Sequence, residues 1–216
     1  MSFKDTKYKI IKSAISQELA DFVYNYFFMK RRVSRFLLDN SYLSPYRDDY
    51  GTWADQQVPE TYANYSDIAM ETLLVKLLPL MKKETDLDLI PTYSYARIYK
   101  KGDALYRHKD RFSCEISTTL NLGGDPWPIY LDPKVGLPVE GEYKSENNPG
   151  VKIDLEQGDM LVYSGCVLEH WREKFEGENC GQVFLHYNNV DTQGKQNLYD
   201  GRPFLGLPSD FKKIQH

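Results

Sequence analysis

Residues 97–110 read RIYKKGDALYRHKD and end in the triplet His108-Lys109-Asp110. In an extended segment, side chains two residues apart point to the same face, so this imidazole and this carboxylate form a chelating pair. A metal held by such a pair needs a further ligand from a distant part of the chain. The stretch therefore predicts a metal site that only the folded chain completes.

His170 is the candidate for that further ligand. The sequence holds four histidines, of which His216 is the terminal residue, and His170 follows the strand-like segment 158–163. Non-haem Fe(II) is held by two histidines and one carboxylate on one face of its octahedron, which leaves three adjacent positions open. A jelly roll brings distant strands side by side. His108, Asp110 and His170 are therefore the predicted metal ligands and catalytic residues.

Helical patterns come first in the chain, and strand patterns follow. Ser16 is a predicted N-cap, apolar residues then recur at helical spacing to Leu38, and a second helix is expected after Ser66, with Pro79 kinking or ending it. Residues 39–65 show no period and indicate a long ordered loop of the kind that forms lids. Short β-rich runs follow at 93–100, 114–122, 128–131, 151–155, 160–164 and 182–188. This order predicts an α+β fold in which N-terminal helices brace a jelly roll, that is, a double-stranded β-helix or cupin-like barrel.

The chain of 216 residues has the length of one domain. We expect a single domain over 1–216, divided into an N-terminal strand, helices and loop (1–90), a jelly-roll core (91–191) and a C-terminal surface segment (192–216). Hydrophobic residues make up 41% of the chain and charged residues 27%, as in ordinary globular proteins. A sizeable core is therefore expected.

Composition disfavours several classes of protein. No apolar run approaches the roughly 20 residues that cross a bilayer, and the start, MSFKDTKYKI, lacks a secretory pattern, so we expect a cytoplasmic protein without membrane partners. The three cysteines stand at unrelated spacings and predict reduced thiols rather than a disulfide framework. A formal net charge of -4 disfavours nucleic acid as a partner. The sequence leaves the oligomeric state open.

The metal-site candidates stand within a longer ordered string. In chain order it comprises Arg97-Ile98-Tyr99, Gly102, His108 with Asp110, ISTTLNL (116–122), Gly123-Gly124, Gly158-Asp159 and His170. This order and spacing resemble the catalytic core of the Fe(II)/2-oxoglutarate-dependent dioxygenase superfamily, of the prolyl-4-hydroxylase type. The resemblance covers residues 93–191, a little under half of the chain.

The resemblance implies an oxidoreductase that hydroxylates a C–H bond. It implies Fe(II) as the metal, with O2 and 2-oxoglutarate as co-substrates and succinate and CO2 as products, the iron acting as the O2-activating centre. It also implies a cation for the distal carboxylate of 2-oxoglutarate. In this family that cation is usually Arg or Lys about ten residues after the second histidine, but residues 180–188 of this chain contain none.

Arg172 is the predicted replacement for that cation. It lies two residues beyond His170, so in an extended strand it faces the same cavity, and a guanidinium binds a carboxylate through two charge-assisted hydrogen bonds. Tyr99 occupies the place where the family often has a tyrosine that contacts the co-substrate, and Gln182 offers a neutral hydrogen bond. These three residues are the predicted 2-oxoglutarate contacts.

Two alternatives stay open on the sequence. The missing cation keeps a cupin-like metal enzyme without 2-oxoglutarate in consideration, and a non-catalytic jelly-roll binding module needs no metal at all. Within the oxygenase interpretation, a prolyl-hydroxylase-like core slightly favours a protein or peptide residue as substrate. A small-molecule substrate is not excluded, because a fold does not identify its substrate.

Overall fold

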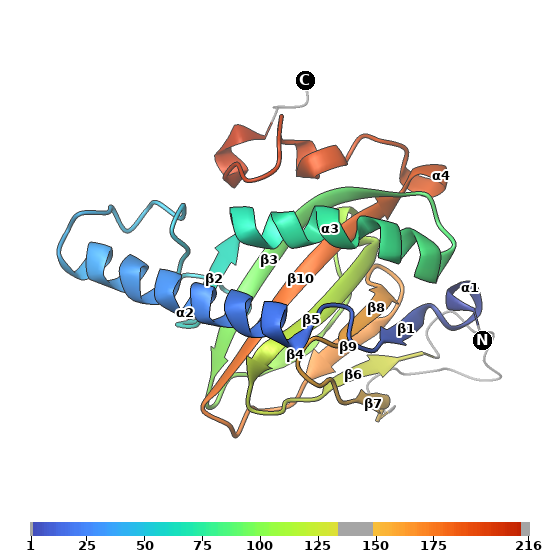
Figure 1. Ribbon diagram of the computed structural model, residues 1–216, viewed down its shortest axis with the longest axis horizontal. Helices are drawn as coiled ribbons and strands as arrows, with labels where there is room; N and C mark the ends of the chain where they lie inside the picture. The colour runs from blue at the N-terminus through green and yellow to red at the C-terminus, as the bar shows by residue number, and fades with distance from the viewer. Residues whose placement is uncertain (1, 134–148, 213–216) are drawn as a thin grey trace.

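The structure is a computed structural model that describes residues 2–133 and 149–212, and two antiparallel sheets form its centre (Figure 1). The large sheet has the strand order β1-β8-β5-β10-β3-β2 and the small sheet the order β4-β9-β6-β7. The strands are β1 (Tyr8–Ile11), β2 (Tyr62–Tyr65), β3 (Leu89–Lys100), β4 (Leu105–His108), β5 (Ile116–Gly124), β6 (Ile129–Asp132), β7 (Val151–Ile153), β8 (Met160–Ser164), β9 (Glu169–Arg172) and β10 (Asn179–Asn189). The helices are α1 (Phe3–Thr6), α2 (Gln17–Asp39), α3 (Ile68–Thr85) and α4 (Val190–Gln193), with 3-10 turns at Phe112–Cys114, Leu198–Gly201 and Ser209–Phe211.

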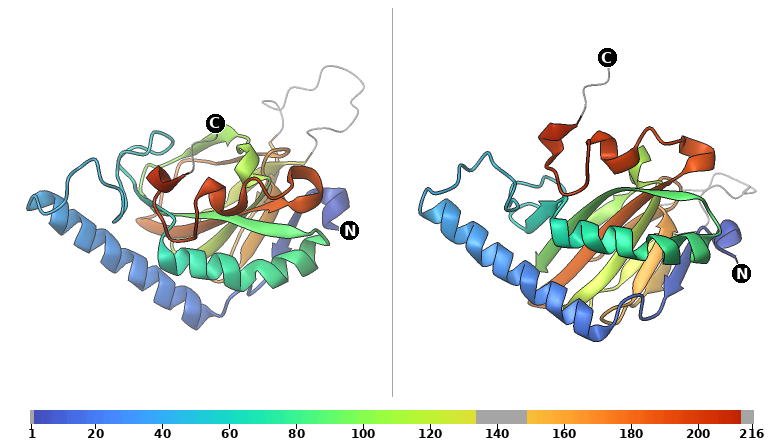
Figure 2. Two further views of the ribbon diagram at one scale, coloured as in Figure 1. Left: turned by 90° about the horizontal axis from the view of Figure 1, so that it is seen from above. Right: turned by 45° about the horizontal axis from the view of Figure 1, so that its top comes forward.

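Helices α2 and α3 cover one face of the large sheet, on the same side in both further views (Figure 2). They do so because each has a buried apolar side, which includes Val23 and Phe27 on α2 and Leu74 on α3. These side chains pack against Leu120 of β5 and Val183 of β10 in the main hydrophobic core. The predicted α+β fold, in which N-terminal helices brace a β-barrel, is confirmed.

The opposite face of the large sheet points toward the small sheet and is unusually polar. Side chains alternate along a strand, so Val183 and Leu185 of β10 join the helix-side core while Gln182 and His186 lie on the other side. Tyr93, Tyr95, Arg97 and Tyr99 likewise line the inner cavity at every second position of β3, whereas Ala96 and Ile98 lie in the core. The alternation of side chains thus places apolar residues on the helix-covered face of the sheet and polar residues on the face that lines the cavity.

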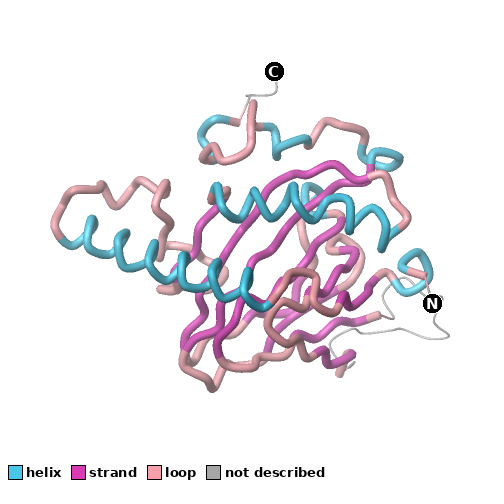
Figure 3. The backbone as a smooth tube through the Cα atoms, viewed as in Figure 1, coloured by secondary structure: helices cyan, strands magenta, loops and turns pink. Residues whose placement is uncertain are grey.

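Most local predictions match the observed elements (Figure 3). The first helix begins after Ser16, whose side chain accepts a hydrogen bond from the backbone of Leu19, and the run at 160–164 is strand β8. Pro79 does not end α3, which continues to Thr85. One detail was wrong: the predicted loop 39–65 ends in strand β2, which pairs with β3, because tertiary pairing overrides local propensity there.

We expected residues 192–216 to form a surface segment. The described part of this segment, however, includes buried residues. Arg202 is buried and forms an ion pair with Glu71 of α3, its Nη2 lying 2.7 Å from Oε1. Glu71 also accepts hydrogen bonds from the backbone amides of Ser94 and Gly206. This carboxylate therefore ties the segment to the helix layer and to β3.

No helix within residues 2–133 and 149–212 is long and apolar enough to cross a membrane.

We expect the substitution Glu71→Gln to destabilise the fold by about 3 kcal/mol, because it leaves the buried Arg202 guanidinium without a compensating charge. The free energy of unfolding in urea measures this. The matched control is Asp88→Asn, which removes the carboxylate of an exposed ion pair with Lys82 and should leave the unfolding midpoint nearly unchanged. Equal effects of the two substitutions would contradict the role given to Glu71.

Candidate metal centre

The antiparallel pairing of β4 and β9 brings two histidines together. His108 lies directly opposite His170 in the register, and their ring centroids are 4.2 Å apart. Asp110 follows the end of β4, and its Oδ1 lies 3.7 Å from Nε2 of His108 and 3.5 Å from Nε2 of His170. One donor atom from each of the three side chains falls within 4.8 Å of the others. The three predicted ligands therefore converge on one point.

Both imidazoles are turned so that Nε2 points toward the carboxylate of Asp110. Nδ1 of His108 lies 2.7 Å from the carbonyl oxygen of Tyr106, and Nδ1 of His170 lies 3.2 Å from that of Leu168. A carbonyl accepts only, so Nδ1 carries the proton in each ring and Nε2 keeps its lone pair. This tautomer is the one that binds a metal through Nε2.

The carboxylate of Asp110 is fixed from its other side. Ser117 of β5 donates its hydroxyl proton to Oδ2 at 2.6 Å, and His186 of β10 lies behind it, with Nδ1 3.1 Å from the Ser117 oxygen. Burial opposes ionisation of Asp110, but the His170 imidazole and the Ser117 hydrogen bond outweigh it and hold the pKa of Asp110 below its usual range. Asp110 is thus an anion at neutral pH, with Oδ1 left facing the two imidazoles.

Gly165 makes this close approach possible. The backbone amide of Asp110 donates to the carbonyl of Gly165 at 2.9 Å. A Cβ on Gly165 would collide with Oδ2 of Asp110 and would lie 2.6 Å from the hydroxyl of Ser117. Only glycine leaves room here for the carboxylate and its hydrogen-bond donor together.

The donor set suits a divalent first-row metal ion. Bonds of about 2 Å at right angles place neighbouring donor atoms ~3 Å apart, close to the observed carboxylate–imidazole separations of 3.5 and 3.7 Å. The set carries one negative charge and two neutral nitrogens. Three protein donors leave three positions of a six-coordinate ion open to other ligands, so the residues fit such a metal.

A cavity of about 350 Å³ opens beside the three ligands. Its walls include the apolar side chains of Leu105, Ile129 and Phe184, together with the phenols of Tyr99 and Tyr163. Burial raises the pKa of Tyr163 well above its ordinary value, so this phenol stays protonated and can only donate or accept a hydrogen bond. Pockets that bind small molecules have this mixture of apolar walls and a few placed polar groups.

Arg172 lies inside the barrel without an acidic partner. It is 1% exposed, and no carboxylate within the described residues lies at ion-pair distance from it. Its guanidinium donates to the carbonyl of Trp127 and, at 3.2 Å, to the hydroxyl of Thr119, while Nε finds no hydrogen-bond partner in the described part of the chain. Burial lowers the pKa of Arg172, and the nearby Cys180, Tyr99 and Tyr163 side chains oppose this. Burial of a cation in this state is costly. Arg172 is not among the residues that line the cavity, so the expectation that it faces that cavity directly is not met.

The two other predicted co-substrate residues occupy different positions. Tyr99 lines the cavity, is fully buried, and accepts a hydrogen bond from Arg97 at 3.2 Å, which leaves its own hydroxyl proton free to donate. Gln182 is engaged on both sides of its amide, accepting from Thr119 at 2.9 Å and donating to Asn121 at 3.2 Å. Gln182 therefore orients Thr119, the hydroxyl that touches Arg172.

The long loop before β2 supplies residues that sequence reasoning missed. Asp55 forms an ion pair with Arg97 at 2.5 Å and accepts a hydrogen bond from Tyr95. The side-chain nitrogen of Gln57 lies 3.1 Å from Nε2 of His108, so this amide occupies the lone pair that a metal would take. Nothing local in the sequence marks Asp55 or Gln57, because the loop has no period. Sequence reasoning also missed Ser117, the residue that donates to Asp110. Strand alternation could have found it, because it lies two positions before Thr119 on the inner face of β5.

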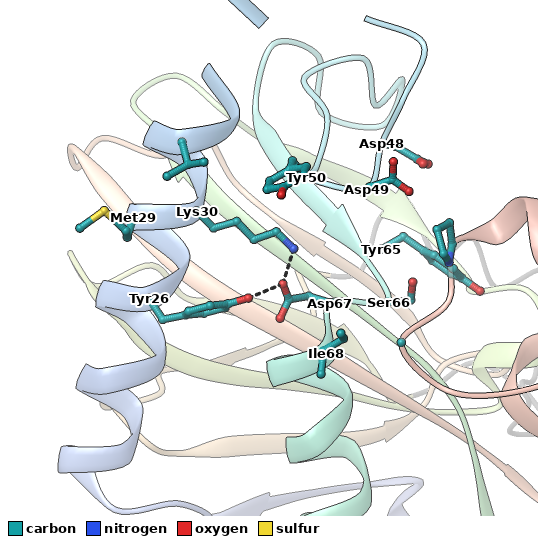
Figure 4. Close-up of a pocket in the computed structure, with 13 residues that line it drawn as sticks. Tyr26, Met29, Lys30, Asp48, Asp49, Tyr50, Tyr65, Ser66, Asp67 and Ile68 are labelled. Atoms are coloured by element: carbon teal, nitrogen blue, oxygen red, sulfur yellow. Dashed lines mark hydrogen bonds and ion pairs between the residues drawn. The ribbon is translucent and has the colours of Figure 1, made fainter. Parts of the chain in front are cut away.

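A larger hollow, of about 520 Å³, lies away from these ligands (Figure 4). It stands between α2, the loop before β2, the start of α3 and the C-terminal segment. Its floor is the buried carboxylate of Asp67, which caps α3 and accepts hydrogen bonds from Lys30 at 2.5 Å and from Tyr26 at 2.8 Å. These polar groups satisfy one another, so the hollow presents no candidate chemistry despite its size.

Comparison with known proteins gives no sequence-level match. No protein-family model matches the chain, and no curated protein matches it. Solved structures do match, across 87% of this chain in each of the following cases.

The similar structures share one fold. They include a prolyl-4-hydroxylase from Pseudomonas putida (15% identity, 95% of that chain covered, TM-score 0.54). A second is the non-haem α-ketoglutarate-dependent epimerase SnoN from nogalamycin biosynthesis (13% identity, 78% of that chain covered, TM-score 0.61). A third is HygX from Streptomyces hygroscopicus with nickel and 2-oxoglutarate bound (15% identity, 85% of that chain covered, TM-score 0.56). The chain thus has the double-stranded β-helix fold that these oxygenases share, as its sequence predicts.

We expect Ser117→Ala to weaken binding of Fe(II) or Mn(II) by roughly 10- to 100-fold, because the carboxylate of Asp110 loses the donor that orients it. Equilibrium dialysis of the metal against the purified chain measures the change. Ser94→Ala is the matched control: Ser94 is also buried on a strand of the large sheet, and its hydroxyl has no hydrogen-bond partner among the described residues. An unchanged metal affinity in Ser117→Ala would show that Asp110 is oriented by the backbone alone.

Proposed function

We propose that the protein is an Fe(II)- and 2-oxoglutarate-dependent dioxygenase that hydroxylates a C–H bond. One observation carries the proposal: two Nε2 nitrogens and one carboxylate oxygen converge beside a cavity, and Arg172, two residues beyond His170 on the same strand, is a buried guanidinium without a carboxylate partner among the described residues. A metal-binding set alone would suit many enzymes. Arg172 is buried and has no carboxylate partner among the described residues, so an anionic ligand would offset the cost of burying its charge.

His108, Asp110 and His170 are the proposed metal ligands. Fe(II) at this site would activate O2 for the oxidation of 2-oxoglutarate to succinate and CO2 and of a substrate C–H bond to C–OH. The protein contributes the neutral tautomer of each imidazole, through the carbonyls of Tyr106 and Leu168, and the fixed orientation of the carboxylate. Gln57 has to leave Nε2 of His108 before a metal binds there.

Arg172 is the proposed partner of the distal carboxylate of 2-oxoglutarate. Tyr99 lies near it with a hydroxyl proton that is free to donate. Thr119 accepts a hydrogen bond from Arg172 and donates its own proton to Gln182, which holds it in position. Arg97 suits this role less well because it already has a carboxylate partner, Asp55. The apolar walls formed by Leu105 and Ile129 keep water from the co-substrate and strengthen each of these polar contacts.

The substrate we propose is either a peptide side chain or a small molecule. A cavity of about 350 Å³ lies at the low end of the range that ligand pockets occupy, and the co-substrate takes part of it. The mouth is therefore suited to a single reacting group rather than to a large buried ligand. HygX, one of the similar structures, has been solved with hygromycin B bound, and other relatives in fold are prolyl hydroxylases, so both substrate classes are represented.

We expect 2-oxoglutarate added without oxygen to the Fe(II)-loaded protein to produce a visible absorption band and to stabilise the fold. At a ligand concentration of 100 times the dissociation constant the stabilisation is about 2.7 kcal/mol. His170→Ala should lose the metal and with it the band. Metal-loaded protein that shows neither the band nor the stabilisation would indicate a metal enzyme that does not use 2-oxoglutarate.

We expect Arg172→Met to abolish stabilisation by 2-oxoglutarate while leaving metal affinity intact. Unfolding of the ligand-free variant should change by less than about 1 kcal/mol, because the loss of two hydrogen bonds is offset by removal of a desolvated charge. Arg172→Lys should restore weak binding, since it keeps the charge but not the planar fork. Strong destabilisation by Arg172→Met together with normal co-substrate binding would assign this arginine a structural role only.

Turnover screening separates the two substrate classes. Succinate release by the Fe(II) protein is measured with a pool of peptides and with a pool of small metabolites, each against a no-substrate baseline. Stimulation by one pool identifies the class, and mass spectrometry of the product should show a gain of one oxygen atom. Baseline succinate release in both pools would contradict hydroxylation of either class.

A further inference from the structure

Helix α2 has an apolar stripe on its solvent side in addition to its buried side. Phe22, Met29 and Phe36 are 69%, 59% and 60% exposed, and Val33 is 40% exposed. The first three are spaced by seven residues, and a helix drifts only about 20° per seven residues, so they lie on one face. Scattered apolar residues on a surface are normal, but a continuous stripe of large ones marks an interaction site.

The stripe is symmetric about Met29. Phe22 and Phe36 lie seven residues before and after it; of the positions four residues before and after it, Asn25 is polar and Val33 is apolar. In an antiparallel pair of α2 helices centred on Met29, each Phe22 lies opposite Phe36 of the second copy and the two Met29 side chains meet. Two-fold interfaces require a patch that complements itself in this way.

The charges along α2 select the antiparallel direction. Glu18 and Asp21 lie near the start of the helix, whereas Arg32 and Arg35 lie in its second half. Arg35 also pairs within its own chain with Asp39, the last residue of the helix, in an exposed contact of 3.1 Å. Antiparallel pairing sets the acidic end of one copy against the basic half of the other. Asp21 and Arg35 of the second copy then fall along the same edge of the stripe, offset by two residues or ~3 Å along the axis. A parallel pair would place like charges together.

The position of α2 leaves this face accessible. Its second half projects past the edge of the large sheet (Figure 1). Met29 and Val33 also line the hollow, and Figure 4 shows the Met29 side chain directed away from the Lys30–Asp67 pair at the floor of that hollow. Tyr42, which is itself exposed, stacks on Phe36 with ring centroids 6.2 Å apart and so widens the apolar surface at this end.

We propose that the chain forms a homodimer through antiparallel packing of its α2 helices, with Met29 at the two-fold axis. The inner side of α2 remains packed on the sheet, and the outer stripe becomes buried against its own copy. The metal ligands and the cavity take no part in this contact, so the proposal does not depend on the catalytic assignment.

The first test is the molar mass of the full chain across a concentration series, measured by sedimentation equilibrium. Wild type should be a dimer, and Met29→Glu should be a monomer throughout, because two carboxylates would face each other at the centre of an apolar contact. Val151→Glu is the control, since Val151 is also an exposed apolar residue but lies on β7 of the small sheet. Circular dichroism should show both variants folded. A monomeric wild type, or a dimer that persists in Met29→Glu, overturns the proposal.

A charge exchange tests the direction of packing. Asp21→Arg alone and Arg35→Asp alone should each weaken the dimer about tenfold, because two-fold symmetry turns one change into two repulsive contacts. The double variant restores opposite charges across the interface and should recover most of the wild-type affinity. Additive weakening in the double variant would show that these residues do not face each other and would refute the antiparallel register.

Discussion

The register between β4 and β9 is the constraint on which the candidate site depends. These short strands place His108 directly opposite His170, and β9 is held on its other edge by β6, where His170 pairs with Leu131. A slip by one residue would turn each imidazole to the other face of the sheet. The carboxylate of Asp110 joins them because the chain leaves β4 and donates its next hydrogen bond to Gly165, beyond the end of β8. Backbone pairing, rather than the side chains themselves, thus sets the distances between the three donors.

The molecule separates the face that stabilises it from the face that carries the site. Phe27, Met70 and Leu74 of the helices pack on the outer face of the large sheet and form the main core. The inner face can then accept polar residues that weaken a fold, among them the buried Arg172 guanidinium. Burying a cation without a carboxylate partner is costly, and the helix-side core compensates for it. This division explains why a chain of ordinary hydrophobic content has so polar a barrel interior.

Helix α2 has one side packed on the large sheet and the other at the proposed dimer contact. A helix with apolar residues on one side only is satisfied by packing on a sheet, but α2 has them on both sides, with Val23 buried and Phe22 exposed. The inner side is used within the chain. The outer side remains for a second copy, and the separation of acidic residues at the start of the helix from basic residues in its second half gives that contact a direction.

Local chemistry determined the elements of this protein. Periods of two and of 3.6 residues located the major strands and both long helices, and the strand alternation placed His108 with Asp110 and His170 with Arg172 on shared faces. Those signals act over a few residues, so one sequence is enough to detect them. Tertiary structure alone decided that Ser117 holds Asp110, that Gln57 covers His108, and that Arg202 is buried against Glu71. Each of these contacts joins segments far apart in the chain, and their partners are chosen by strand register and by packing, which no local pattern encodes.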